Sequence, residues 1–373
     1  MPTHPVLNAR ATRRCTGAMP VLLVALALAA SAQAAAPAPT NWHFVVAGDS
    51  RNCGAVVMPS IAAGARQHGA AFYWHLGDLR AIYDFDEDFR QLYPRAHIYD
   101  YLNDAWPEFQ RDQIEPFGEI PFVVGIGNHE TIPPKTREEF VVSFADWLDA
   151  EPIRKQRLQD DARDHRVRTY FHWQRDGVDF VYIDNASPDQ PDAAQLAWLT
   201  TVLERAAADA GIRAVVVGMH EALPESLARG HSMSDSPAQD AAGRRVYARL
   251  LDVNRVKPVY VLASHSHFVM AGIFNTAYWR EHGGVLPGWI VGTAGAVWYE
   301  LPADSPQATF ARARVYGYLL ATVKPRGTDD RDPIQFEFTE VSESAVPPAT
   351  AERFGQDFVH RCYTENVPHE TRR

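Results

Sequence analysis

The sequence predicts an α/β fold, because short apolar runs alternate with stretches that have helical spacing. Residues 42–47, 71–76 and 121–126 are apolar and rich in β-branched or aromatic side chains, which is typical of buried strands. A helical stretch at residues 56–68 lies between the first two runs. This order is typical of a sheet with crossover helices. With 373 residues, of which 46% are hydrophobic and 22% charged, the chain can bury a large core.

The N-terminal segment has the three parts of a secretory signal peptide. Three arginines precede an apolar run at residues 21–30, and Ala32-Gln33-Ala34 matches a cleavage site. We therefore expect residues 1–34 to be removed and the protein to be exported, to a periplasmic or extracellular location. The apolar run is too short to span a bilayer comfortably, so no stable membrane insertion is expected after cleavage.

The net charge limits the class of ligand, and the cysteine content bears on disulfide formation. The formal net charge of −10 makes nucleic-acid binding through phosphates a poor hypothesis. Of the three cysteines, Cys15 leaves with the signal peptide, and Cys53 and Cys362 remain. In an oxidising compartment these two can pair, which would tie the C-terminal segment to the loop after the first strand. Two free or buried thiols are the alternative, and the sequence leaves both open.

A long connection at residues 79–120 separates the second and third predicted strands. It is crowded with aromatic and acidic side chains, and residues 90–110 have the character of a helix. A long insertion between strands that carry a site can form a cap over that site. A peripheral subdomain with its own small core is the alternative.

The remainder of the chain continues the alternation. Further strands are predicted at residues 168–173, 178–185, 316–323 and 334–341, and further apolar runs begin at Ala214, Val259 and Trp289. Helices are predicted at residues 138–150 and 192–211, the second of which starts at a capping box and ends at a glycine. Residues 346–373 open with two prolines and are predicted to be a polar tail.

Candidate metal ligands follow five of the apolar runs directly. They are Asp49, Asp78, Asn128 with His129, His220, and His265 with His267. Carboxylate, amide and imidazole groups together suit divalent transition metals, whereas a structural zinc site would prefer thiolates and needs four ligands. Six or seven candidates at strand ends are therefore better explained by a dinuclear centre, with the ions roughly 3.5–4 Å apart.

The order and context of these motifs resemble a known family. Gly48-Asp49, Gly77-Asp78, Gly127-Asn128-His129-Glu130, Gly218-Met219-His220 and Ser264-His265-Ser266-His267 resemble the motif series of the calcineurin-like metallophosphoesterases, which include purple acid phosphatases and phosphodiesterases. The resemblance covers about residues 43–296. It implies a β-sandwich of two mixed sheets flanked by helices, a four-layer α/β/β/α arrangement, for a catalytic domain at residues 41–345.

The resemblance also implies a role for each motif residue. Two transition-metal ions, Fe, Zn or Mn, are expected. Asp49, Asp78 and His267 would bind the first ion, and Asp78 would bridge to the second. The second ion would take Asn128, His220 and His265. His129 resembles the catalytic histidine that is not a ligand, and Glu130 would orient it in place of the more usual Asp.

The chain departs from the family pattern at two positions. Arg51 occupies the position of the usual first-motif His, and a guanidinium cannot ligate a metal. A Tyr that fills this role in purple acid phosphatases would fall at Ala81 here, with Tyr83 two residues further on. Arg51 could instead hold a phosphate by a bidentate contact, or form a salt bridge to a nearby acid. The second departure is Ser264, which replaces the usual Gly before the His pair.

These observations predict a secreted dinuclear-metal hydrolase that cleaves a small phosphomonoester or phosphodiester with metal-activated hydroxide. In this scheme His129 protonates the leaving alkoxide or stabilises its charge. The rival hypothesis is a degenerate metal- or phosphate-binding protein without hydrolase activity, which the loss of the first-motif His favours. Asn185-Ala186-Ser187 is also a glycosylation sequon, relevant only in a eukaryotic secretory host.

Overall fold

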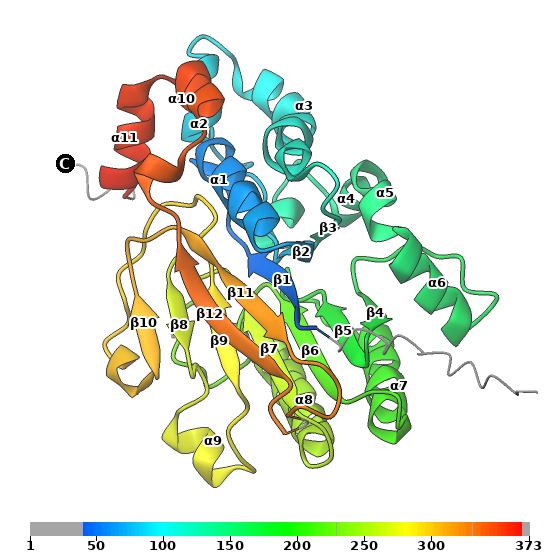
Figure 1. The fold of residues 1–373 in the computed structure, drawn as a ribbon. Helices are drawn as coiled ribbons and strands as arrows, with labels where there is room; N and C mark the ends of the chain where they lie inside the picture. The colour runs from blue at the N-terminus through cyan, green and yellow to red at the C-terminus, as the bar shows by residue number, and fades with distance from the viewer. Residues whose placement is uncertain (1–39, 229, 330, 368–373) are drawn as a thin grey trace, which may run out of the picture. The chain divides into compact units, whose positions relative to one another are not determined.

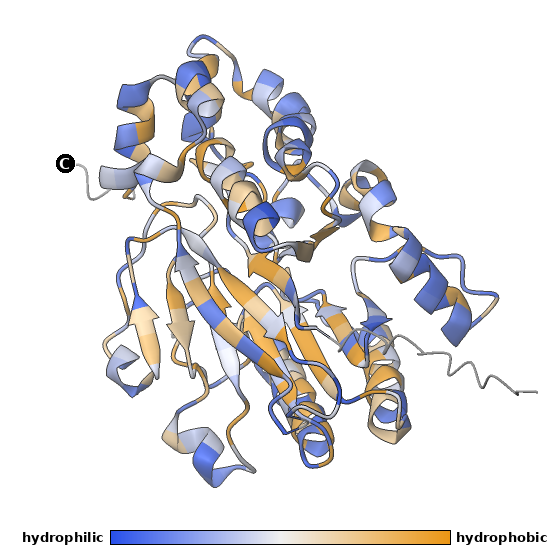
Figure 2. Ribbon diagram, in the orientation of Figure 1, coloured by the Kyte–Doolittle hydropathy of each residue, from blue (hydrophilic) through white to orange (hydrophobic). Residues whose placement is uncertain are grey.

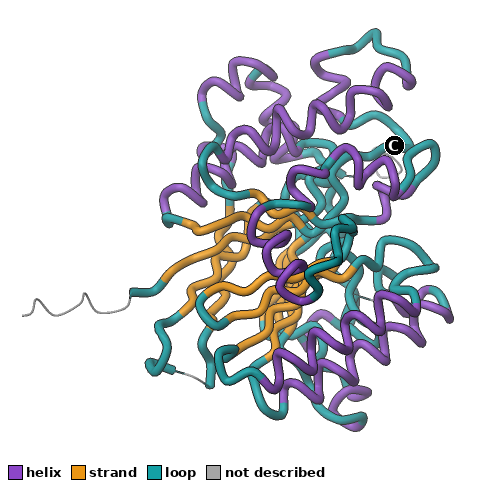
Figure 3. The backbone as a smooth tube through the Cα atoms, turned by 90° about the vertical axis from the view of Figure 1, so that its right-hand side faces the viewer, coloured by secondary structure: helices purple, strands orange, loops and turns teal. Residues whose placement is uncertain are grey.

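The computed structural model describes residues 40–367, apart from residues 229 and 330. The predicted signal peptide at residues 1–34 lies outside the described part. In the described part, two mixed β-sheets of five and seven strands pack face to face, and helices cover their outer sides (Figures 1 and 3). The α/β sandwich expected from the motif resemblance is therefore confirmed.

The first sheet carries the N-terminal strands. Its strand order is β12 (Ile334–Glu340), β11 (Gly317–Val323), β1 (Trp42–Ala47), β2 (Ala70–His75) and β3 (Phe122–Val124). The strands β1, β2 and β3 run parallel, whereas β11 pairs antiparallel with β1 and with β12. The carboxyl ends of β1, β2 and β3 therefore lie at the same edge.

The second sheet has the same mixed character. Its strand order is β10 (Phe310–Arg312), β8 (Val269–Ala271), β9 (Gly288–Val291), β7 (Val259–Ala263), β6 (Ala214–Met219), β5 (Val178–Ile183) and β4 (Phe171–Arg175). The four central strands β9, β7, β6 and β5 are parallel. Parallel strands buried on both faces are expected to be almost continuously apolar, and Figure 2 shows β5, β6 and β7 in this way.

The helices are distributed on both sides of the sandwich. Helix α1 (Gly54–Gln67) packs on the first sheet, and α7 (Ala193–Ala208) and α8 (Pro237–Asn254) pack on the second. The others are α2 (Glu87–Leu92), α3 (Ile98–Phe109), α4 (Arg137–Ser143), α5 (Ala145–Leu148), α6 (Glu151–Asp160), α9 (Ala277–Glu281), α10 (Pro348–Phe354) and α11 (Gln356–Thr364). Among the described residues, none of the helices combines the length and the apolar composition needed to cross a membrane.

Successive side chains of a strand point to opposite faces of its sheet, and this divides most buried apolar residues into two large clusters. On β5, Phe180 faces the first sheet, where its ring lies 5.2 Å from that of Phe44 on β1. The next residue, Val181, faces the opposite way and joins the cluster beneath α7 and α8. Because side chains alternate across a strand, one sheet contributes to both the central core and the helix-covered core.

The segment 79–120 differs from its prediction in one respect. The helix expected over residues 90–110 is interrupted between α2 and α3, because Pro94 disfavours helical backbone at the residue before it. Four buried residues of this segment, Ile82, Phe89, Tyr101 and Ala105, form a small apolar cluster separate from the two large ones. The segment therefore has a core of its own.

The residues after Val346 are not a simple polar tail up to the last described residue. They form α10 and α11, whose buried residues Ala351, Phe354, Phe358, Val359 and Cys362 join the central core. The helical spacing of these few apolar residues was obscured by the polar residues between them. Cys362 forms a disulfide with Cys53, just before α1, so the pairing that the sequence left open is present in the structure.

Candidate metal centre

Side chains that follow strands of both sheets come together in one place. Asp49, Asp78 and Asn128 follow β1, β2 and β3, and His220, His265 and His267 follow β6 and β7. The ligand atoms of Asp78, His220 and His265 all lie within 4.8 Å of one another, as do those of Asp49, Asp78 and His267. Asp78 belongs to both groups. We call Asp49, Asp78 and His267 the first group, and Asp78, Asn128, His220 and His265 the second group.

Three of the candidate ligands have a strained backbone. Asp49, Asp78 and His265 have φ angles of 60°, 59° and 63°, which place them in the left-handed region. This conformation costs a non-glycine residue roughly 1–2 kcal/mol. Such strain persists only where the surrounding structure enforces it, and it is common at functional sites.

Two glycines let the loops that carry Asp78 and Asn128 touch. A Cβ atom on Gly77 would lie 2.5 Å from the backbone N of Gly127, and one on Gly127 would lie 2.4 Å from the backbone N of Asp78. Gly77 also has a φ of 96°. Only glycine fits at both positions, which explains the Gly directly before Asp78 and the Gly directly before Asn128.

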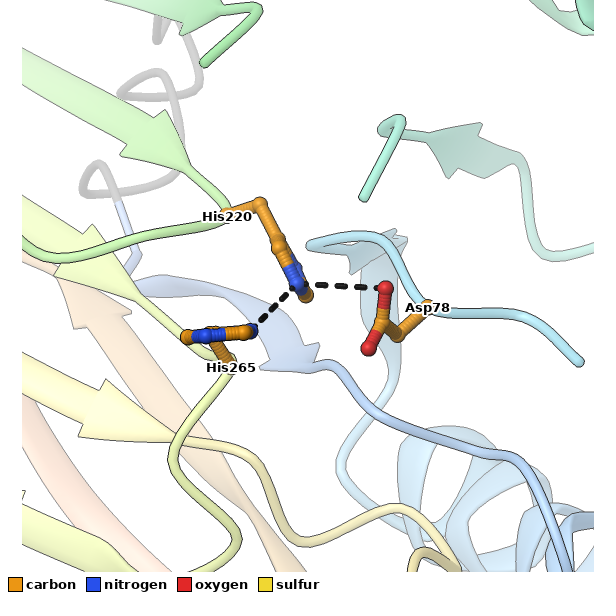
Figure 4. Close-up of side chains that lie close together, drawn as sticks. All are labelled: Asp78, His220 and His265. Carbon is orange, nitrogen blue, oxygen red and sulfur yellow. Dashed lines mark hydrogen bonds and ion pairs between the residues drawn. The ribbon is translucent and has the colours of Figure 1, made fainter. Parts of the chain in front are cut away.

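The second group is a set of converging acceptors around His220, and Figure 4 shows three of its members, Asp78, His220 and His265. The Nε2 atom of His220 lies 3.1 Å from Asp78 Oδ1, 3.1 Å from His265 Nδ1 and 2.9 Å from Asn128 Oδ1. Four lone pairs that point at one another repel unless a proton or a cation lies between them. The donor set of carboxylate, amide oxygen and two imidazoles therefore fits a divalent transition metal.

The orientation of the His220 ring is fixed by contacts of its Nδ1 atom, the ring nitrogen that faces away from the second group. Its Nδ1 atom lies 3.0 Å from the carbonyl oxygen of Leu76 and 3.1 Å from Ser264 Oγ. With the proton on Nδ1, the lone pair of Nε2 points into the second group. Burial alone would lower the pKa of His220, but Asp78 and Asp49 outweigh it and raise the pKa to about 10. The raised pKa means that Nε2 also carries a proton in the metal-free protein, and a bound cation would replace this proton. Ser264, which differs from the family pattern, thus contacts the ligand directly.

Asn185 holds the backbone of His220 in place. It was not identified from the sequence as a site residue. It follows β5, and its side-chain oxygen accepts hydrogen bonds from the backbone N–H groups of His220 and Glu221, both at 3.1 Å. Its amide nitrogen donates to the carbonyl oxygen of Glu221 at 2.7 Å. Asn185 is 0% exposed, so it is inaccessible to a glycan in the folded protein. Its place at the end of a strand was the signal that could have identified it.

Arg51 lies among the residues of the first group. The Nη2 atom of Arg51 lies 2.8 Å from His267 Nε2, and its Nη1 atom lies 2.6 Å from His129 Nε2. Its Nε atom lies 3.7 Å from Asp78 Oδ2. Within the described part of the chain, Asp49 Oδ1 and Asp78 Oδ2 are buried without a hydrogen-bond partner. The guanidinium therefore lies among the groups that the family resemblance assigns to the first metal ion.

His129 is held by a different residue from the one expected. Its Nδ1 atom donates to the carbonyl oxygen of Ala81 at 2.6 Å. The carboxylate of Glu130 instead accepts from three backbone N–H groups, those of Gly127, Asp78 and Leu79. Glu130 thus joins two ligand loops, and Ala81 orients His129. Burial and the adjacent charge of Arg51 lower the pKa of His129 to about 4, so its ring is neutral near pH 7.

Aromatic side chains surround the two groups. The ring of Tyr299 stacks on His267, with centroids 3.9 Å apart, and lies 4.9 Å from the ring of His231. Tyr83 lies 5.1 Å from His129 and is 64% exposed. Tyr299 and His231 lie in loops without a strand-end motif, so no sequence pattern pointed to them.

Comparison with known proteins gives the following matches. The family model for calcineurin-like phosphoesterases matches residues 43–269. Among solved structures, the purple acid phosphatase PPD1 from yellow lupin (Lupinus luteus) seeds has 16% identity and a TM-score of 0.57, covering 81% of this chain and 52% of that one. The chain thus spans about half the length of that phosphatase. At this identity the likeness shows the fold alone.

Two further structures match over most of this chain. PhoD has 14% identity and a TM-score of 0.47, covering 88% of this chain and 77% of that one. GAP50, the anchor in the inner membrane complex of Plasmodium, has 10% identity and a TM-score of 0.47, covering 89% of this chain and 99% of that one. No curated protein matches the sequence.

Proposed function

Because the chain belongs to the calcineurin-like phosphoesterase family, we propose that it is a metal-dependent hydrolase of phosphoric esters. The observation that carries this proposal is the second group. Asp78, Asn128 and His220, together with His265, direct oxygen and nitrogen lone pairs toward one another in a strained and rigidly supported arrangement. These four residues would hold the cation.

The reaction we propose is direct hydrolysis. When bound, a divalent transition metal supplies Lewis acidity and makes hydroxide available near neutral pH. Hydroxide attacks phosphorus, the bond from phosphorus to the leaving oxygen breaks, and the leaving oxygen takes up the proton that water lost when the hydroxide formed. No covalent intermediate with the protein is required.

The residues of the chain would orient the ester and stabilise charge. Asn128 and His265 are partly exposed, whereas Asp49 and Asp78 are fully buried, so the ester would approach from the side of Asn128 and His265. Arg51 would stabilise negative charge on the phosphoryl oxygens. Because Nε2 of His129 accepts a hydrogen bond from Arg51, we propose that His129 acts by holding the guanidinium and not by donating a proton.

The substrate class remains a small phosphomonoester or phosphodiester. Tyr83, in the segment 79–120, contacts His129, which supports a role for this segment as a cap. A closed cap favours small monoesters, whereas an open groove favours diesters. The metal is proposed to be Fe, Zn or Mn, since imidazole, amide oxygen and carboxylate ligands suit these ions.

We propose export from the cytoplasm, with residues 1–34 as signal peptide and residues 41–345 as catalytic domain. The disulfide between Cys53 and Cys362 supports this proposal, because structural disulfides persist mainly in oxidising compartments. The packing of α10 and α11 on the central core supports counting residues 346–367 with the same folded unit.

A second candidate function is binding of a metal or phosphate without hydrolysis. The observation that favours it is the contact between Arg51 and His267, which occupies a predicted metal ligand. This candidate predicts that the protein binds a cation or inorganic phosphate but turns over no ester.

The test is turnover by the mature protein of one aryl phosphomonoester and one aryl phosphodiester. We expect hydrolysis of at least one ester, its loss after exhaustive chelation, and its recovery when Mn²⁺ or Zn²⁺ is restored. Full activity in the chelated protein would contradict the proposal. Cation binding without turnover of either ester would favour the second candidate.

A further inference from the structure

We propose that this centre holds one metal ion instead of two, and that the guanidinium of Arg51 takes the place of the first ion. This inference rests on the proposed cation at the second group. It goes beyond the proposed function because it assigns a fixed protein charge to a position that the motif series assigns to a metal.

The lone pair of His267 is the first reason. Nδ1 of His267 donates to the carbonyl oxygen of Val297 at 2.6 Å, so Nε2 carries the lone pair. That lone pair accepts a hydrogen bond from Arg51 Nη2 at 2.8 Å. A metal ion at the first group would need the same lone pair. One lone pair cannot serve both, so the guanidinium and the ion exclude each other.

Charge is the second reason. Arg51 is 4% exposed, and an arginine stays protonated even when buried. Three buried carboxylates, those of Asp49, Asp78 and Glu130, supply three negative charges. Arg51 and one divalent ion balance these charges. A second divalent ion would leave an excess of two positive charges in a site that water scarcely reaches, where like charges repel strongly.

The third reason is that the residues directly before and after Arg51 are held in place by other parts of the fold. Before it, Ser50 N–H donates to the carbonyl oxygen of Asp78 at 3.0 Å. After it, Asn52 N–H donates to Asp86 Oδ1 at 2.5 Å, and Cys53 is joined to Cys362. The backbone that carries Arg51 is thus tied to the ligand loop, to the segment 79–120 and to α11.

The segment 79–120 therefore has a function that the sequence did not suggest. Besides Asp86, it provides Asp88, whose carboxylate accepts from Ala55 N–H at 2.9 Å, and Ala81, which orients His129 against the guanidinium. Both imidazoles that accept from Arg51 are thus fixed by backbone carbonyl oxygens. This is a built cradle for a guanidinium and not a chance contact of a mobile side chain.

The experiment is the metal content of the mature protein after loading with Mn²⁺ and removal of free ions. We expect one ion per chain in the wild type and two in Arg51→His, which removes the charge and restores an imidazole beside Asp49 and His267. Arg51→Lys keeps the charge and should stay at one ion. Electron paramagnetic resonance should show isolated Mn²⁺ in the wild type and a spin-coupled pair in Arg51→His.

Controls separate the two proposals. Arg163→His adds an imidazole at an exposed arginine that is not part of the motif series and should stay at one ion. Two ions in the wild type would overturn this inference and leave the proposed function standing, whereas no ion in the wild type would overturn both. One ion in a folded Arg51→His variant would show that Arg51 does not exclude the second ion. Thermal unfolding establishes that each variant is folded.

Discussion

At the scale of single residues, the centre depends on which atom of each histidine carries the proton. His129, His220 and His267 all direct Nδ1 at a backbone carbonyl oxygen, so each turns Nε2 toward the carboxylates. A neutral imidazole in this tautomer is an acceptor, so His129 and His267 are suited to hold a guanidinium, and His220 is suited to hold a cation once that cation has replaced its second proton. The backbone carbonyl oxygens thus determine what the three side chains can bind.

Asp78→Asn should remove metal and activity together, because Asp78 is the one carboxylate in both ligand groups. His129→Ala should lower turnover by orders of magnitude but keep the metal, since His129 contacts Arg51 and is not assigned as a ligand. Elemental analysis alongside turnover distinguishes the two. Asp161→Asn, at an exposed aspartate, is the matched control and should change neither. Metal loss in His129→Ala would contradict the assignment.

Asn185→Ala should weaken metal binding without touching a ligand. The change removes the acceptor for the backbone N–H groups of His220 and Glu221 and leaves both unpaired in a buried place. Loss of a partner behind a ligand typically costs 10–100-fold in metal affinity, and each unpaired donor costs about 1–3 kcal/mol. Competition with a chelator measures the affinity. An unchanged affinity in Asn185→Ala would show that His220 does not depend on this support.

At the scale of elements, the sequence predicted those parts of the fold in which neighbouring residues decide the outcome. Strands such as β1 and β6 are short apolar runs followed at once by a ligand, and both were found. The motif order also predicted which side chains would meet. Tyr299 and His231 were missed because their approach to the centre depends on long-range packing of loops. The helices α10 and α11 were missed because they are stabilised mainly by tertiary contacts.

An ion cluster between β4, β5 and α6 gives the fold a pH dependence of its own. His172 on β4 lies between Asp179 Oδ1 at 2.9 Å and Asp160 Oδ2 at 2.5 Å. Burial lowers the pKa of His172, but the hydrogen bonds and charges of the two carboxylates outweigh it and raise the pKa to about 9. A raised histidine pKa stabilises the fold fully below the ordinary value near 6.5, and this stabilisation is lost as pH rises through about 9.

His172→Gln should therefore destabilise the protein at pH 6 by roughly 2 kcal/mol and by much less at pH 10. Chemical denaturation of wild type and variant at the two pH values measures the difference. His165→Gln, at an exposed histidine, is the control and should have little effect at either pH. A penalty of equal size at pH 6 and pH 10 would mean that the charge of His172 contributes nothing.

At the scale of the whole molecule, a disulfide links the C-terminal helix α11 to the loop beside the candidate metal centre. The disulfide joins residues 309 positions apart and connects the start of α1, two residues after Arg51, to α11. Closing so long a loop restricts the unfolded chain severely, and the loop-entropy model gives a stabilisation of roughly 6 kcal/mol. The loop that carries Arg51 is also held by hydrogen bonds of the backbone N–H groups of Ser50, Asn52 and Cys53, which do not depend on the disulfide.

Replacing both cysteines, as Cys53→Ser with Cys362→Ser, should consequently lower the free energy of unfolding by several kcal/mol. The metal content at 25 °C should stay the same, because the hydrogen bonds that place Arg51 remain. Denaturant unfolding of the double variant, compared with the wild type in oxidised and reduced form, measures the first quantity, and elemental analysis measures the second. The reduced wild type should match the double variant. A second ion in the double variant would contradict this expectation. It would mean that the backbone hydrogen bonds alone do not keep the guanidinium between His129 and His267, and that the disulfide is needed as well.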